Sequence, residues 1–192
     1  MTDIQSLISD LTSGNDDFAE FTVDQIVARG TEALPALFEL LDSPNPNNRW
    51  WALRVLAVIH DHQVPARLQD ALHDSDHTIR QCAALGLSKQ TSVAAIPDLI
   101  KTLSDEDRLA ARLAGDALVS IGGPAVQPLI EVLEGDENGA RVEAARALGL
   151  IGDARAIPAM FAAWEDGSAL IQHWIEQGFQ KMGVGMQFFN PE

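Results

Sequence analysis

The sequence predicts an all-α chain, an α-solenoid of about six helix pairs with a period of 30–32 residues. Three observations predict this class. A pattern of two helical stretches recurs along the chain, apolar residues recur at a nearly constant spacing, and glycines follow the end of several second stretches. No segment has the alternating pattern that is typical of strands.

Each copy of the pattern opens with an apolar stretch near a proline, passes through a polar turn and continues as a second helical stretch. The opening stretches are ALPALFELLD (33–42), QVPARLQDAL (63–72), AAIPDLIKTL (94–103), AVQPLIEVLE (125–134) and RAIPAMFAAW (155–164). The second stretches begin at Arg49, Arg80, Ala111, Arg141 and Gln172. Proline suits the first turn of a helix, because the N–H that it lacks would have no partner there.

One core position sets the register of the repeats. Its members are Leu56, Leu87, Leu118, Leu148 and Phe179, at successive spacings of 31, 31, 30 and 31 residues. A second row lies four residues earlier and consists of Ala52, Ala83, Ala114, Ala144 and Ile175. A third row lies three residues later, which completes an amphipathic helical stripe. Gly122, Gly152 and Gly183 follow this stripe, where a helix C-terminus commonly needs glycine.

The two ends of the chain depart from the repeat. Residues 1–30 look like a degenerate copy, with helices expected over 4–11 and 17–29, and their many acidic residues suit a solvated cap repeat. We therefore expect one solenoid domain over 1–183, in which 31–183 hold five full repeats. A tail follows at 184–192, and Phe188 and Phe189 are expected to cover the last core face.

The charge of the chain limits its partners. There are 28 acidic residues against 13 Lys and Arg, a net charge of -15. Such a field repels phosphate, so we expect neither nucleic acid nor an anionic membrane as a partner. It serves solubility or recruits a basic partner. The first residues do not resemble a signal peptide and no stretch approaches about 20 apolar residues, so a cytoplasmic protein is expected.

A resemblance to a known family rests on the fourth of these repeats. The stretch RVEAARALGLIG, from Arg141 to Gly152, resembles the HEAT-like repeat of phycobilin lyases of the E/F type, and the resemblance covers roughly residues 30–183. It implies a HEAT-repeat solenoid. It leaves the function open, because this superfamily includes bilin lyase subunits, phycobilisome-degradation adaptors, deoxyhypusine hydroxylases, DNA glycosylases and plain scaffolds.

The candidate binding surface is the concave face formed by the second helices, where the stripe opposite the buried rows is expected to be exposed. Trp and Arg, the residues enriched at binding hot spots, are concentrated on this stripe. The predicted partner-binding residues are Trp50, Trp51, Arg54, Gln81, Leu85, Arg112, Asp116, Arg146, His173, Trp174 and Gln177. The alternative is that the indoles pack between neighbouring helices. We predict a groove with one aromatic end at Trp50 and Trp51 and another at His173 and Trp174.

Other polar residues favour structural roles. Arg49, Arg80 and Arg141 are expected to pair with aspartates of the turns. His73 and His77 have the i, i+4 spacing of metal ligands, but a turn lies between them, so no metal is predicted. The single cysteine, Cys82, is interpreted as a small apolar residue, since nothing nearby in the sequence would activate it. No catalytic residues and no cofactor are predicted.

These observations favour a protein-interaction scaffold or adaptor that binds another protein on its concave face. The alternative is a phycobilin lyase or chaperone-like subunit, in which aromatic residues would cradle a tetrapyrrole and Arg residues would bind its propionates. The chain is thus expected to bind rather than to catalyse, and if it is an enzyme it is a lyase subunit. Recognition of DNA lesions is the third possibility, and the acidic charge opposes it.

Overall fold

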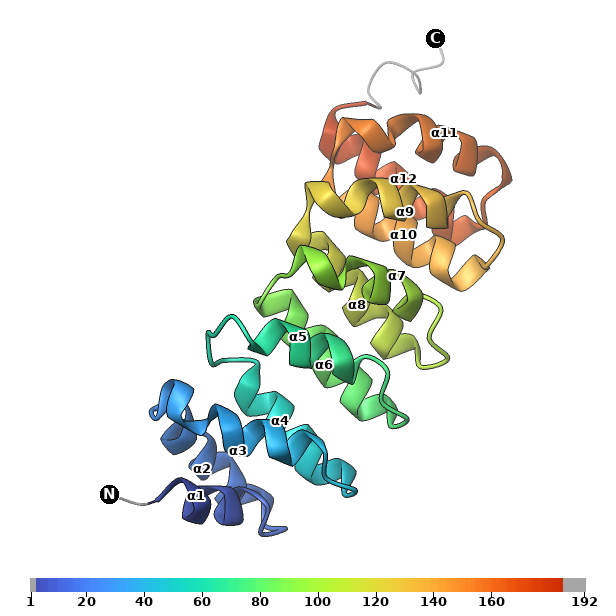
Figure 1. Cartoon of the computed structure of the whole chain (residues 1–192). Coiled ribbons are helices and arrows are strands. Elements are labelled where there is room, and N and C mark those ends of the chain that lie inside the picture. The colour runs from blue at the N-terminus through green and yellow to red at the C-terminus, as the bar shows by residue number, and fades with distance from the viewer. Residues whose placement is uncertain (1–2, 185–192) are drawn as a thin grey trace. The chain divides into compact units, whose positions relative to one another are not determined.

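The computed structural model describes residues 3–184. Over that range it contains twelve α-helices, four short 3-10 helices and no strand. The α-helices are labelled in Figure 1. The chain divides between Gln90 and Thr91 into two compact units. Each unit holds three helix pairs, so the predicted all-α architecture of about six pairs is confirmed.

The N-terminal unit is built from pairs α1–α2, α3–α4 and α5–α6. Their bounds are Ile4–Leu11 (α1), Asp16–Val27 (α2), Leu34–Leu41 (α3), Pro46–Leu56 (α4), Val64–Ala71 (α5) and His77–Lys89 (α6). The two helices of each pair contact each other, and α2, α4 and α6 also contact one another in order along the unit. These second helices therefore form one continuous layer.

The C-terminal unit repeats the arrangement with pairs α7–α8, α9–α10 and α11–α12. Their bounds are Ile96–Thr102 (α7), Arg108–Ile121 (α8), Val126–Leu133 (α9), Asn138–Ile151 (α10), Ile157–Asp166 (α11) and Ala169–Met182 (α12). First helices α7, α9 and α11 contact one another in order, as do second helices α8, α10 and α12. This unit thus has two helical layers, as a stack of solenoid repeats does.

The predicted register is confirmed by burial. All members of the first two rows are buried, from Leu56 and Ala52 in α4 to Phe179 and Ile175 in α12. In the third row Gln90 replaces an apolar residue, and its buried amide nitrogen donates a 2.7 Å hydrogen bond to the carbonyl oxygen of Leu56. The polar side chain is tolerated there because it is hydrogen-bonded.

Each second helix from α2 to α10 begins at a side-chain cap. The capping residues recur once per repeat and accept hydrogen bonds from backbone N–H groups of the first turn: Asn15, Asn45, Asp76, Asp107 and Glu137. Such caps satisfy N–H groups that a helix leaves unpaired. At the other end, Gly122, Gly152 and Gly183 have φ values of 76°, 72° and 72°, so the predicted helix ends are confirmed.

The predicted N-terminal cap repeat forms two helices, α1 and α2, close to the expected bounds. Of the predicted tail only Val184 is described, so the roles expected for Phe188 and Phe189 lie outside the described residues. Because the chain forms two compact units, a single continuous solenoid over residues 1–183 stays a prediction.

A helix that crosses a membrane must be both long and predominantly apolar. No single helix among the described residues meets both requirements, whereas Arg108–Ile121 and Gly123–Leu133 meet them only as a pair bent by 120°.

Candidate functional site

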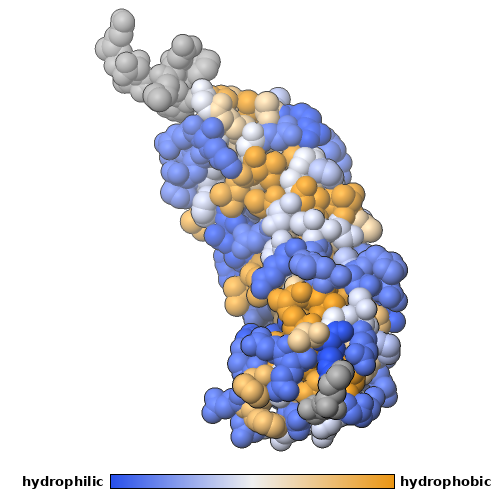
Figure 2. Space-filling model, turned by 90° about the vertical axis from the view of Figure 1, so that its left-hand side faces the viewer, coloured by the Kyte–Doolittle hydropathy of each residue, from blue (hydrophilic) through white to orange (hydrophobic). Residues whose placement is uncertain are grey.

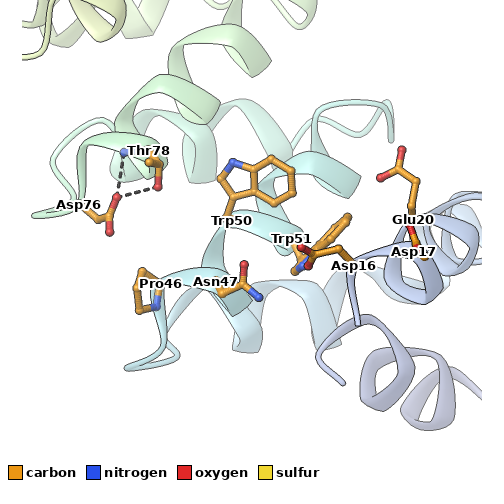
Figure 3. A pocket seen from close by; sticks show the side chains of 9 residues that line it. All are labelled: Asp16, Asp17, Glu20, Pro46, Asn47, Trp50, Trp51, Asp76 and Thr78. Carbon is orange, nitrogen blue, oxygen red and sulfur yellow. Dashed lines mark hydrogen bonds between the residues drawn. The ribbon is translucent and has the colours of Figure 1, made fainter. Parts of the chain in front are cut away.

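An open groove of about 630 Å³ lies in the N-terminal unit. Its lining comes from the start of α2, from α4 and from the start of α6: Asp16, Asp17, Glu20, Pro46, Asn47, Trp50, Trp51, Asp76 and Thr78. Figure 3 shows Trp50 in the middle, with Asp76 and Thr78 on one side and the three acidic residues of α2 on the other. We call this feature the Trp50 groove.

Two indoles and one arginine form the aromatic part of this site. The rings of Trp50 and Trp51 meet edge to face, with their centroids 4.9 Å apart. The guanidinium carbon of Arg54 lies 5.5 Å from the centroid of Trp50 and 5.8 Å from that of Trp51, within the range of cation–π attraction. Arg54 also pairs with Glu20 of α2. Its cationic head is therefore held between an indole pair and a carboxylate.

The acidic residues of the groove have different partners. The Asp76 carboxylate accepts hydrogen bonds from the hydroxyl of Thr78 (2.6 Å) and its backbone N–H (2.8 Å). These bonds lower the pKa of Asp76 below its ordinary value. Asp16 and Asp17 lie exposed in the first turn of α2, where the helix dipole favours negative charge. Neither has an ion-pair partner within residues 3–184.

The C-terminal unit holds a second aromatic and cationic cluster. The guanidinium carbon of Arg112, on α8, lies 5.5 Å from the ring centroid of Trp174, on α12. The ring of His173 meets that of Trp174 edge to face at 5.3 Å. Arg112 and Trp174 are partly exposed and His173 is exposed. Within the described part of the chain, no carboxylate pairs with Arg112, so its charge is available to an anion.

Two residues expected on the exposed stripe are buried instead. The Arg146 side chain is 1% exposed and lies between α8 and α10, where it donates hydrogen bonds to Asp116 and Glu143, both at 2.7 Å. Trp51 is 4% exposed and contributes only to the wall of the Trp50 groove. The placement of Arg146 on an open surface was therefore wrong, whereas the burial of Trp51 agrees with the alternative that its indole packs between helices.

The remaining predicted site residues are at least partly exposed. Trp50, Arg54 and Gln81 are half-buried, Leu85 is exposed, and in the other unit Gln177 is exposed and Asp116 partly exposed. The predicted groove from Trp50 to Trp174 would involve both units, so it stays a prediction, as does the binding role of each residue. Figure 2 shows hydrophobic residues in separate patches among hydrophilic ones on the side that it displays.

The recurrent arginines were predicted to pair with turn aspartates, and this pairing is confirmed for Arg49, while Arg141 pairs with an aspartate at the end of α11. Arg49 donates two hydrogen bonds of 2.8 Å to the carboxylate of Asp74, in the turn of the following pair. Arg141 pairs with Asp166 at 3.0 Å. Arg80 instead donates to the carbonyl oxygens of the turn that precedes its own helix. These arginines hold turns in place and are not an anion-binding ladder.

Burial raises the pKa of the Cys82 thiol to about 11, against smaller opposing effects of Arg54 and Lys89. A thiol with this pKa is neutral at physiological pH and is a poor nucleophile. Among the described residues, no three His, Cys, Asp or Glu side chains lie close enough together to hold a metal ion. The two clusters offer indole faces, carboxylates and the guanidinium of Arg112, groups that can contact charged and aromatic partners.

Sequence reasoning identified the aromatic residues of the Trp50 groove and missed its carboxylates. Asp16, Asp17 and Glu20 were interpreted only as the solvated face of a cap repeat, because their helix shows no strong repeat pattern. Asp76 carries a local signal, since an aspartate directly before a helical stretch is typical of an N-cap.

Comparison with known proteins places these features in a family. The model of HEAT repeats matches residues 4–88, 34–118 and 96–180. Phycocyanobilin lyase subunit beta of Thermosynechococcus vestitus is 40% identical over 81 residues, 42% of this chain and 38% of the relative. Phycobilisome maturation protein of Synechococcus elongatus is 34% identical over 114 residues, 59% of this chain and 54% of the relative. The chain thus spans about half or less of the length of these curated relatives.

One solved structure contains a chain whose fold is similar to that of this protein. The complex of CpcE and CpcF of phycocyanin lyase from Nostoc sp. PCC7120 contains a chain that matches with a TM-score of 0.61 and 26% identity. The match covers 75% of this chain and 96% of that one. The resemblance to phycobilin lyases of the E/F type is thereby confirmed, and the chain belongs to the HEAT-repeat family.

Proposed function

We propose that the chain is a binding subunit of the phycobilin-lyase type, which holds a partner protein and a bilin for attachment chemistry that the partner completes. The observation that carries this proposal is its 34–40% identity to a phycocyanobilin lyase subunit and a phycobilisome maturation protein. The match to a chain of the CpcE–CpcF complex supports a second protein as partner.

The geometry supports a binding role rather than a nucleophilic one. The thiol of Cys82 is neutral at physiological pH, so a thioether bond to a bilin would be made by a cysteine of the acceptor protein. Arg112 and Trp174 complement the groups of a linear tetrapyrrole. Arg112 offers a cation for a propionate carboxylate, and Trp174 offers an aromatic face for a pyrrole ring.

A spectroscopic experiment tests the proposal. Purified chain at about 100 μM is mixed with phycocyanobilin, and a red-shifted visible band is expected when the bilin is bound. An apo-phycocyanin subunit and a lyase subunit of the relatives' type are then added, and covalent attachment is followed by denaturing electrophoresis and bilin fluorescence. Serum albumin at the same concentration controls for non-specific binding. An unchanged spectrum together with an unchanged attachment yield would overturn the proposal.

The second candidate function is a protein-interaction scaffold that handles no bilin. The Trp50 groove favours it, because its four carboxylates would repel the propionates of a bilin. The same titration separates the two functions, since a scaffold leaves the bilin spectrum unchanged and still forms a complex with its partner protein in size-exclusion chromatography.

A further inference from the structure

The Trp50 groove combines an apolar wall with unbalanced negative charge. Trp50 and the largely buried Trp51 are among its lining residues, and four carboxylates line it: Asp16, Asp17, Glu20 and Asp76. No Lys or Arg is among its lining residues. Glu20 is balanced by Arg54, and Asp76 is held as a carboxylate by Thr78. Asp16 and Asp17 are left as the charges that a ligand can neutralise.

Arg54 shows how this site holds a cation. Its guanidinium lies over both Trp50 and Trp51 and pairs with Glu20, so indole and carboxylate already act together on one positive group. The groove offers the same two elements to a second cation, namely the part-exposed ring of Trp50 and the carboxylates of Asp16 and Asp17. Figure 3 shows Trp50 lying between Asp76 and the acidic residues of α2.

The negative charge of the Trp50 groove determines which kind of ligand can bind there. An anionic ligand would meet the carboxylates of Asp16, Asp17 and Asp76 on a chain of net charge -15, and a second copy of the chain would meet the same repulsion. A cationic group gains both the attraction of the carboxylates and that of the indole face. The volume of about 630 Å³ lies within the range of ligand pockets, about 300–1,000 Å³, and the groove is open, so an extended peptide can cross it.

We infer that the Trp50 groove is a docking site for an extended basic segment of a partner protein, with one Arg or Lys side chain stacked on Trp50 and neutralised by Asp16 and Asp17. This inference goes beyond the proposed function and does not depend on bilin binding.

The first test uses a fluorescently labelled hexa-arginine peptide and the full chain. Anisotropy is expected to report saturable binding that weakens as salt is added, because salt screens exposed charges. The double variant Asp16→Asn, Asp17→Asn is expected to bind about ten-fold more weakly. The matched control is Glu134→Gln, Asp136→Asn, two exposed acids of the C-terminal unit whose replacement changes the net charge equally. Equal weakening by both pairs, or no saturable binding by the unaltered chain, overturns the inference.

The second test separates aromatic stacking from charge. Trp50→Leu is expected to weaken hexa-arginine binding about five-fold, whereas Trp50→Phe keeps an aromatic face and retains most of the affinity. Circular dichroism of each variant confirms that the helices remain. Equal affinities of Trp50→Leu and the unaltered chain contradict stacking on Trp50.

A competition experiment with phycocyanobilin distinguishes the docking site from the proposed bilin function. Phycocyanobilin is expected not to displace the labelled peptide, and displacement would contradict the assignment of this groove to a cation. An unchanged bilin spectrum with intact peptide binding would overturn the bilin function alone. A red-shifted bilin band without peptide binding would overturn the docking site alone.

Discussion

The buried guanidinium of Arg146 donates a 2.7 Å hydrogen bond to the carboxylate of Asp116, which lies one repeat earlier in the chain. It donates a second bond of the same length to Glu143 and a third, of 2.9 Å, to the carbonyl oxygen of Arg112. Gly115 leaves the space for this guanidinium, because a Cβ there would lie 2.7 Å from a guanidinium nitrogen of Arg146. The network joins α8 to α10 within the C-terminal unit.

Replacing Arg146 with Met is expected to destabilise the chain by about 3 kcal/mol, because Glu143 then keeps a largely buried charge without its partner. Urea unfolding followed by circular dichroism measures the change. Adding Asp116→Asn and Glu143→Gln to Arg146→Met is expected to restore part of the loss, since both unpaired charges are removed. The control Arg155→Met breaks the exposed pair with Asp153 and an exposed hydrogen bond to the carbonyl oxygen of Gly123, so it should leave the midpoint nearly unchanged. Equal midpoints for Arg146→Met and Arg155→Met would contradict the role of the network.

Two glycines allow α10 and α12 to approach closely. A Cβ on Gly178 would lie 2.7 Å from the Cα of Gly149 and 2.7 Å from the Cε of Met160. Gly178→Ala is therefore expected to destabilise the chain by about 2 kcal/mol in thermal or urea unfolding, because the helix backbones must separate.

Gly86 provides the matched control for this prediction. The three atoms nearest to a methyl group there would be side-chain carbons of Leu68, at 3.0, 3.0 and 3.5 Å, and these can shift. The higher helix propensity of Ala, about 1 kcal/mol, offsets the crowding, so Gly86→Ala should be nearly neutral. A neutral Gly178→Ala would show that the α10–α12 crossing tolerates an added methyl group.

The fold could be predicted because it repeats. Leu118 and Leu148 occupy equivalent positions one repeat apart, so the buried face of every second helix followed from one alignment. The exposed face could not be predicted in the same way. Arg146 was placed on it by helical spacing, yet Gly115 has no side chain and leaves a buried space that the arginine fills. A single sequence does not show which neighbour covers a residue opposite the core.

The Trp50 groove shows the same limit. Trp50 was identified from its place in the repeat, whereas Asp16 and Asp17 lie more than thirty residues earlier, in the degenerate first repeat. Their position in the same groove depends on how α2 packs against α4. That packing is a tertiary relationship, and no local pattern in the first repeat indicates it.

The proposed bilin function makes Arg112 a testable residue. Arg112→Gln is expected to weaken phycocyanobilin binding about ten-fold, because the charge-assisted bond to a propionate is lost while the neighbouring ring of Trp174 remains. The change is measured by absorbance titration. Arg108→Gln, four residues earlier on the same helix, is exposed and removes the same charge, so it serves as the control. Equal affinities of these two variants would argue against a propionate contact at Arg112.

The thiol of Cys82 gives a prediction that depends on pH. Burial raises its pKa from the ordinary value of 9.0 to about 11, so the thiolate fraction at pH 8 is about a hundred-fold lower than for an unperturbed thiol. Alkylation by iodoacetamide, followed by mass spectrometry, should be slow at pH 8 and accelerate about ten-fold per pH unit up to about pH 11. The chain unfolded in urea is the control and should react fast at pH 8.

The same shift couples Cys82 to stability. Between pH 9 and about 11 the unfolded thiol releases its proton while the folded thiol keeps it, so the free energy of unfolding falls as the pH rises through this window. In Cys82→Ser this contribution is absent, and urea midpoints measured from pH 8 to about 11 should decline less steeply than those of the unaltered chain. Parallel declines for the two proteins, or equally fast alkylation of folded and unfolded chains at pH 8, would show that the thiol is accessible and ionises normally.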